Sequence, residues 1–108
     1  VANTAIGYNA LEALTTGTQN TSVGAYALDA ITTGTTCTAV GYQALTANTA
    51  SNNAAFGSTA LATNTTGAQN CAFGHAALVS TTTGSDNSVF GYAAMLLIIL
   101  LLVIEHYM

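Results

Sequence analysis

The sequence predicts an all-β fold, a β-solenoid (β-roll) of about six coils of 16–17 residues each, and three observations support this prediction. A nine-residue phrase, first present as Asn-Thr-Ala-Ile-Gly-Tyr-Asn-Ala-Leu from Asn3, occurs six times. Its central glycines lie 17, 17, 16, 17 and 17 residues apart. Frequent Gly and Thr, and the lack of a helical stripe before residue 93, disfavour helices. A short fixed period indicates identical units that bury their apolar faces against one another. The glycines are Gly7, Gly24, Gly41, Gly57, Gly74 and Gly91.

Each copy is expected to contain a strand, represented by residues 4–11, because apolar residues alternate along it. Ile6, Tyr8 and Ala10 would then share one face, and Ala5, Gly7, Asn9 and Leu11 the other. Three apolar columns run through the copies: Ile6, Val23, Val40, Phe56, Phe73, Phe90; Ala10, Ala27, Ala44, Ala60, Ala77, Ala94; and Leu11, Leu28, Leu45, Leu61, Leu78, Met95. Because the adjacent Ala and Leu columns are both apolar, either the strand bends there or both of its faces are covered.

A second, shorter strand is expected near residues 13–14 and 30–31, followed by a Thr-Thr-Gly return corner. The corner glycine would supply a positive φ at no steric cost. The third copy is one residue short and has Ala50 at the glycine position, which predicts an altered corner.

An asparagine column precedes the strand, and Asn tolerates the left-handed region and hydrogen-bonds locally. Stacked Asn side chains can also bond to one another along the column. The column comprises Asn3, Asn20, Asn53, Asn70 and Asn87.

Charge is nearly absent: the chain has no Lys or Arg, and only 4% of its residues are charged against about 25% in an average domain. Without cations it cannot neutralise phosphates, so nucleic acids and anionic lipid headgroups are excluded as expected partners.

Cys37 and Cys71 lie two copies apart, and coils rising ~4.8 Å each would separate them too far for an intrachain disulfide. They are expected to be two buried thiols or to bond between chains. The chain starts in mid-phrase, as a piece of a longer protein would.

A coil this short encloses a thin core, because only about three apolar side chains per turn can point inward. A single stack would leave one apolar column uncovered and both ends open. Three chains packed about a common axis would cover that column, so the sequence predicts a homotrimeric rod.

The phrases Asn-Thr-Ala-Ile-Gly-Tyr-Asn-Ala-Leu and Asn-Thr-Ser-Val-Gly-Ala-Tyr-Ala-Leu, each followed by Thr-Thr-Gly, resemble the repeats of phage and viral tail-fibre shafts. They are also similar to the head domains of trimeric autotransporter adhesins. The resemblance spans residues 3–95. It implies a homotrimeric β-solenoid at the cell or virion surface or otherwise extracellular, with a host-surface receptor or glycan as a further partner. The chain departs from these proteins in lacking Lys and Arg and in its apolar tail.

Two regions are expected, the repeat solenoid of residues 1–95 and a C-terminal tail of residues 96–108. The uninterrupted apolar run 93–104 is shorter than the ~20 residues of a membrane span, so a membrane is not an expected partner. The tail would be a buried axis helix or cap, a donor strand that joins a neighbouring chain, or the truncated start of a span.

No residue pattern indicates an enzyme, a cofactor or a zinc site. His75 occupies a tyrosine column and is expected to be a partly exposed ring, whereas His106 beside Glu105 could ligate a metal at a trimer axis. Glu12 and Asp29 are equivalent and indicate a solvated edge, with weak Ca²⁺ binding as the alternative. Asn20 and Asn64 are formal glycosylation acceptors; Asn20 is better explained by its place in the asparagine column, and Asn64, expected in a loop, is the more plausible acceptor.

Three functions compete. The favoured one is a structural or adhesive module of an extracellular or virion fibre. An ice-binding solenoid is the second, and it depends on an unbroken threonine ladder. A self-polymerising, amyloid-like filament assembled through the tail is the third. The ladder residues are Thr16, Thr33, Thr49, Thr66 and Thr83.

Overall fold

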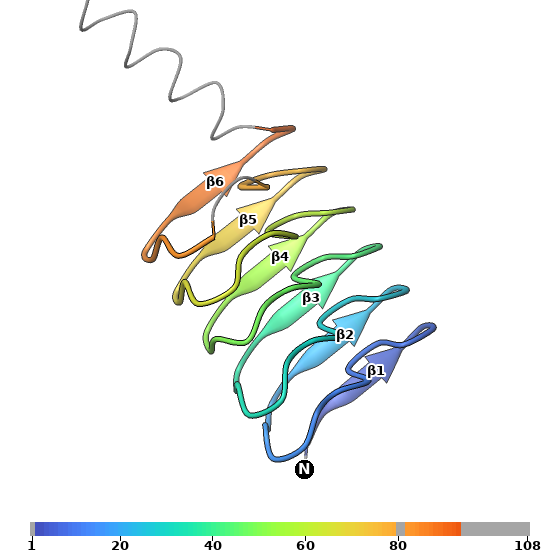
Figure 1. The fold of residues 1–108 in the computed structure, drawn as a ribbon. Helices are drawn as coiled ribbons and strands as arrows, with labels where there is room; N and C mark the ends of the chain where they lie inside the picture. The colour runs from blue at the N-terminus through green and yellow to red at the C-terminus, as the bar shows by residue number, and fades with distance from the viewer. Residues whose placement is uncertain (1, 80–81, 94–108) are drawn as a thin grey trace, which may run out of the picture.

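Six short parallel strands form one sheet in chain order, as Figure 1 shows. The structure, a computed structural model, describes residues 2–79 and 82–93. The strands are β1 (Thr4–Ile6), β2 (Thr21–Val23), β3 (Thr38–Val40), β4 (Ala54–Phe56), β5 (Cys71–Phe73) and β6 (Ser88–Phe90). Each strand pairs with the equivalent residues of the next copy, and this register continues across the short third copy, where Val40 pairs with Phe56. The predicted β-solenoid is therefore confirmed.

Each strand is three residues long, so the eight-residue strand predicted for residues 4–11 is wrong. The chain leaves the sheet at Gly7, whose φ is 126°. Asn9 and Leu11 then take left-handed φ values of 59° and 56°, which interrupts any extended run. The amide of Ala10 donates to the Gly7 carbonyl at 3.2 Å and closes a turn. Of the two sequence alternatives the bend is correct, because it carries both the Ala and the Leu column into the interior.

The return side of each coil contains turns, so the second strand expected at residues 13–14 and 30–31 is also wrong. Successive coils are nevertheless joined on this side by single backbone hydrogen bonds. Leu11 N donates to Ala27 O at 3.2 Å, and Ala13 N donates to Asp29 O at 3.3 Å. The left-handed φ values of Asn9 and Leu11 interrupt the extended backbone that a continuous ladder would need.

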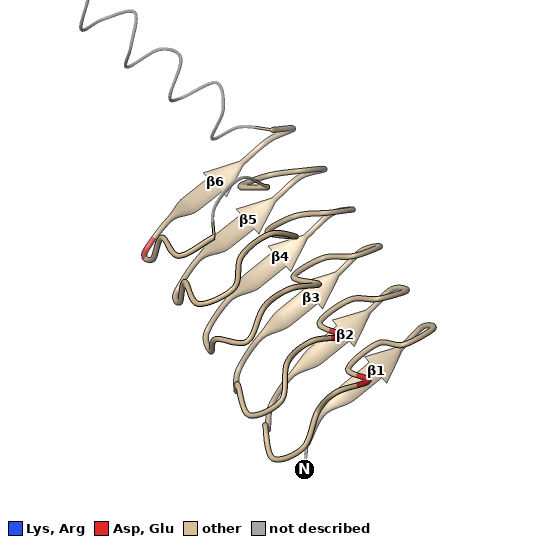
Figure 2. Ribbon diagram, viewed as in Figure 1, with Lys and Arg blue, Asp and Glu red and all other residues tan. Residues whose placement is uncertain are grey.

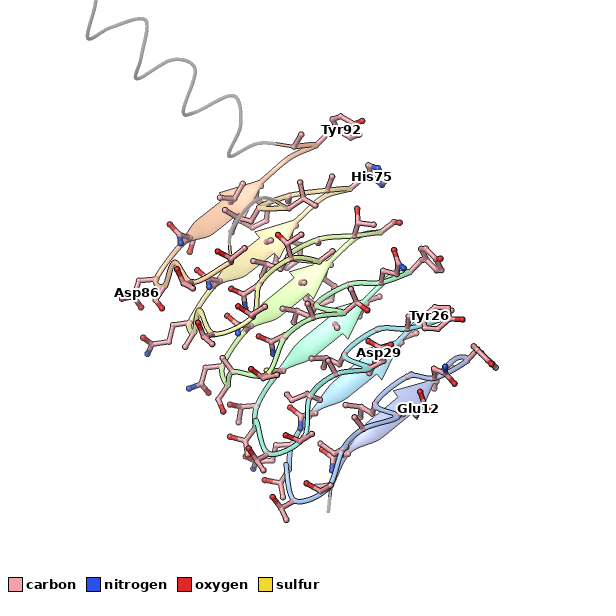
Figure 3. All side chains as sticks on the ribbon, in the orientation of Figure 1. Glu12, Tyr26, Asp29, His75, Asp86 and Tyr92 are labelled. Carbon is pink, nitrogen blue, oxygen red and sulfur yellow. The ribbon has the colours of Figure 1, made fainter. Side chains whose placement is uncertain are left out.

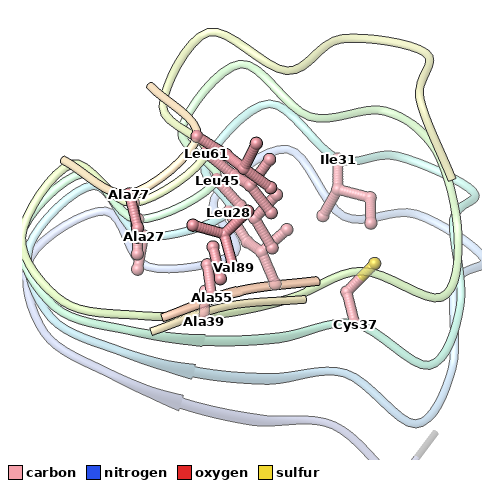
Figure 4. Close-up of a cluster of buried hydrophobic side chains, with 14 of the residues drawn as sticks. Ala27, Leu28, Ile31, Cys37, Ala39, Leu45, Ala55, Leu61, Ala77 and Val89 are labelled. Carbon is pink, nitrogen blue, oxygen red and sulfur yellow. The ribbon is translucent and has the colours of Figure 1, made fainter. Parts of the chain in front are cut away.

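The core is a column of leucines enclosed by alanines, as Figure 4 shows. Leu28, Leu45 and Leu61 have no exposed surface. Each fully buried leucine contributes about 1.5–3 kcal/mol. The central strand residue also points inward and is small, as Ala39, Ala55 and Ala72 illustrate, because the opposite wall lies close. Leu11 and Leu78 extend the leucine column toward the two ends.

The Thr-Thr-Gly glycines serve close packing and not a positive φ, which corrects the expectation for these corners. Left-handed φ values occur at the phrase-centre glycines and not at Gly17 or Gly67. A Cβ on Gly17 would lie 2.2 Å from the carbonyl oxygen of Gly34, and one on Gly67 would lie 2.1 Å from that of Gly84. The coils therefore approach each other too closely at this corner for a side chain.

The asparagine column forms a ladder between coils, in which most bonds join a side chain to the backbone and the amide nitrogen of Asn87 donates to the Oδ1 of Asn70 at 3.0 Å. Asn20 N donates to the Oδ1 of Asn3 at 2.9 Å, and Asn70 N donates to the Oδ1 of Asn53 at 3.0 Å. The side-chain nitrogen of Asn20, Nδ2, donates to Gly34 O at 2.9 Å. These side chains thus tie the strand entry of one coil to the corner of the next. The left-handed residue is the preceding one, for example Gln19 with φ 61°, and not the asparagine as expected.

The interior changes character along the stack. The wall position that holds Leu14 and Ile31 in the first two copies holds Asn48 and Asn64 in the next two. Both asparagines are fully buried. The Asn48 amide donates to Ala50 O at 2.8 Å, which closes the altered third corner. Across the coil, the Oδ1 of Asn48 accepts hydrogen bonds from Asn53 and Asn64 at 3.0 and 2.8 Å.

No helix within residues 2–79 and 82–93 is long and apolar enough to cross a membrane. The tail prediction for residues 96–108, the boundary at residue 95 and the columns' last members, Ala94 and Met95, lie outside the described residues.

Candidate interaction surfaces

The outer face of the sheet carries an apolar strip along the whole stack. In β2 to β6 the middle side chain is buried in the core and the third is not, as buried Ala39 and half-buried Val40 illustrate, whereas all three residues of the end strand β1 are exposed. We call the outward third positions the outer strip. It comprises Ile6, Val23, Val40, Phe56, Phe73 and Phe90. The sequence identified this column as apolar, and the structure places it on the surface.

The outer strip becomes more bulky toward the C-terminal end. The rings of Phe56 and Phe73 stack with centroids 4.5 Å apart and planes within 10°. Phe73 and Phe90 stack in the same way at 4.8 Å and 16°. At the two ends of the stack Ile6 is 61% exposed and Phe90 is 73% exposed. A continuous apolar strip of this length in water is typical of a surface that contacts another molecule.

The acidic side chains lie away from the outer strip. Figure 2 shows the described acids on the loops and turns, with none on a strand. Asp29 accepts a hydrogen bond from Thr46 Oγ1 at 2.8 Å, which fixes this carboxylate on the return side of the coil. The chain has no Lys or Arg to place beside the strip. A partner for this face therefore meets an uncharged apolar surface.

A second surface, which we call the aromatic edge, lies where the chain turns after each strand. It comprises Tyr8, Tyr26, Tyr42, His75 and Tyr92. Tyr26, His75 and Tyr92 project beyond the arrowheads in Figure 3, on the opposite side from Asp86. Tyr26 makes T-shaped contacts with Tyr8 at 5.6 Å and with Tyr42 at 6.1 Å.

Sequence reasoning recognised Tyr8, Tyr42, His75 and Tyr92 as one column but missed Tyr26. Tyr26 lies one position later in the repeat, and the alternation of a flat strand would place it on the opposite face. The sequence signal that could have identified Tyr26 is that Ala25 replaces the tyrosine of this column and an aromatic residue follows it directly. With φ at 62°, the left-handed backbone of Tyr26 returns its ring to the same edge.

The threonine ladder does not follow the predicted register. Thr49 N donates to Thr65 O at 3.0 Å, as Thr15 N does to Thr32 O. Thr49 therefore belongs with the first threonine of each corner, and the third copy has no member in the column of Thr16 and Thr33. The missing residue of the short copy causes this break, and the column that continues through all five corners is that of the first threonines, Thr15, Thr32, Thr49, Thr65 and Thr82. The predicted ladder residues are therefore corrected, and the ice-binding hypothesis stays a prediction.

Both cysteines are free thiols. Cys37 replaces asparagine in the ladder and is buried; its backbone amide donates to Asn20 Oδ1 at 2.9 Å. Burial raises the pKa of the Cys37 thiol above its ordinary value, and hydrogen bonds from Asn53, Asn48 and Asn52 oppose the shift. Cys71 is half-buried at the start of β5.

The remaining candidate residues stay separate. His75 is exposed, as expected, and stacks on Tyr92 at 5.2 Å. Within the described residues no group of three or more His, Cys, Asp or Glu could hold a metal ion, and His106 lies outside them. Glu12 is exposed and Asp29 half-buried.

The glycosylation expectation for Asn64 is wrong for the folded chain. Asn64 is fully buried, and its amide nitrogen donates to Asn48 Oδ1 and to Gly67 O. Asn20 is buried in the same way, with its amide bonded to Gly34. A sugar on either amide nitrogen would displace these bonds and would have no route to the surface.

Searches of protein-family models, curated proteins and solved structures found no match to this chain.

Proposed function

We propose that the chain is a structural and adhesive module of an extracellular or virion-surface fibre, in which three copies form one rod. The observation that carries this proposal is the outer strip. It places six aliphatic and aromatic side chains on one face, from β1 to β6, with no charged residue among them.

Three copies of the outer strip around a common axis would remove these side chains from water. Each square ångström of apolar surface buried this way contributes roughly 25 cal/mol. The stacked phenylalanines give the C-terminal half the larger share, because aromatic side chains bury the most area. The repetitive backbone adds stiffness, since among the described residues successive coils are bonded both along the strands and at the turns.

A trimer and a dimer differ in the number of chains around the axis, and the mass of the particle in solution distinguishes them. Small-angle scattering of the 108-residue chain should give the mass of a trimer and an elongated shape. Phe73→Glu should reduce the mass to that of a monomer, because it places three carboxylates at the apolar axis. Thr66→Glu, which adds the same charge at an exposed corner, should leave the trimer intact.

Circular dichroism of both variants establishes that they keep the β-solenoid. A folded Phe73→Glu variant that remains trimeric would reject the outer strip as the interface. A compact monomer for the unaltered chain would reject the rod itself.

A further inference from the structure

The N-terminal half of the aromatic edge combines exposed rings with uncommitted amides. We define the tyrosine triad as Tyr8, Tyr26 and Tyr42. Tyr8 is 70% exposed and Tyr42 is 50% exposed, although both are large apolar rings. The side-chain amides of Asn9 and Gln43 lie next to them in the chain and form no hydrogen bond among the described residues. We propose that the tyrosine triad binds an uncharged polysaccharide.

The geometry of the triad suits an extended ligand that runs along the rod. Tyr8 and Tyr42 are two coils apart in one column, and coils spaced like neighbouring strands separate them by about 9.6 Å. Tyr26 fills the interval, in contact with both. The three rings thus form a contiguous row along the stack, in which the plane of Tyr26 is nearly perpendicular to those of Tyr8 and Tyr42. The faces of Tyr8 and Tyr42 are then available to two sugar rings of one polymer, with Tyr26 between them.

Sugar rings match this chemistry. The axial C–H groups on one face of a pyranose carry partial positive charge and pack on the negative face of an aromatic ring. The hydroxyl groups at the ring margin require both donors and acceptors, which an amide side chain supplies together. Asn9 and Gln43 offer such amides beside the tyrosines.

Charge excludes the other polymers that stack on aromatic rings. A nucleic acid or an acidic polysaccharide needs cations, and the chain has no Lys or Arg and a formal net charge of −4. Among polymers that stack on aromatic rings, a neutral polysaccharide needs no cations from the protein.

The C-terminal half of the same edge provides an internal comparison. His75 stacks on Tyr92, which is 71% exposed, so a ring of equal exposure is present there. The residues that correspond to Asn9 and Gln43 are Ala76 and Ala93, which offer no side-chain hydrogen bond. Rings and amides therefore coincide only at the triad.

This site deepens the adhesive role proposed above and rests on it. The test is affinity electrophoresis of the 108-residue chain in gels that contain a soluble β-glucan, a galactomannan or starch, with alginate as the anionic comparison. At least one neutral polymer should retard the chain, and alginate should not. Tyr8→Ala should weaken binding by up to about tenfold, the worth of one aromatic contact, whereas Tyr92→Ala should leave it nearly unchanged.

Retardation by no neutral polymer would overturn the proposal, as would an equal loss in Tyr8→Ala and Tyr92→Ala. Sedimentation equilibrium of the same variants separates the two proposals. If Tyr8→Ala dissociates the oligomer, the triad is a contact between subunits and the sugar site is wrong. If sugar binding fails while the trimer persists, only the sugar site is lost.

Discussion

The two faces of the same six strands differ in a way that reverses the usual arrangement. The inward residues are small and completely buried, as Ala39, Ala55 and Ala72 are. The outward residues are large, and among them Ile6 and Phe90 are mostly exposed. The leucines from the return side of the coil fill the space above the small inward residues, whereas the described chain covers the large outward residues only in part, and contiguous exposed apolar surface is typical of an interaction site. The difference supports the proposal that the outward side chains contact another chain.

The comparison first predicts two kinds of cost for truncating an apolar side chain. Leu61→Ala removes a fully buried side chain from the core and should cost about 2–5 kcal/mol of unfolding free energy at any protein concentration. Phe73→Ala should cost an amount that grows with protein concentration, because the loss acts through the assembly. Urea unfolding at several protein concentrations distinguishes them. Equal concentration dependence for both variants would remove the distinction between the faces.

Two adjacent alanines on opposite faces of β4 allow the inward and outward faces to be compared with the same substitution. Ala55 points inward with no exposed surface, and half-buried Ala54 points outward. Ala55→Leu should destabilise the chain by about 1–3 kcal/mol because the coil has no room for the larger side chain. Ala54→Leu should cost much less. The thermal midpoints of the two variants provide the measurement, and a larger loss in Ala54→Leu would mean that the face assignment is reversed.

The smallest expected effect concerns the buried thiol. Because burial raises the folded-state pKa of Cys37 above its ordinary value, the folded chain retains the proton at a pH where the unfolded chain loses it. The stability due to this thiol is complete below the unfolded pKa and falls as the pH rises from there toward the folded pKa, by at most about 1.4 kcal/mol per pH unit.

Unfolding free energies at pH 7 and pH 10 should therefore differ less for Cys37→Ala than for the unaltered chain. An identical pH dependence in the two proteins would contradict the assignment of this effect to Cys37.

The repeat period predicted the fold because a fixed spacing forces equivalent residues into columns. The Leu column and the asparagine ladder followed from the same reasoning. The strand length did not, since left-handed conformations at Asn9 and Leu11 cannot be read from residue type. A left-handed leucine costs about 1–2 kcal/mol, which burial of its side chain offsets in the folded stack.

The interaction surfaces were only partly predictable. The sequence identified the outer strip as an apolar column but did not establish which columns the coil encloses, because that depends on the bend at Gly7. Tyr26 and the buried Asn48 and Asn64 depend on the same backbone path. The sequence indicated that the corners require glycine, but it predicted a positive φ as the reason. The actual reason, the close approach of the next coil, is visible only in the folded structure.

Sedimentation equilibrium of the unaltered 108-residue chain, over a range of concentrations, tests most directly whether sister chains cover the outer strip. We predict a single species with three times the mass of the 10.8 kDa chain that dissociates only on dilution. A monomer at every concentration, with the phenylalanine stack of β4 to β6 left in water, would contradict the central claim.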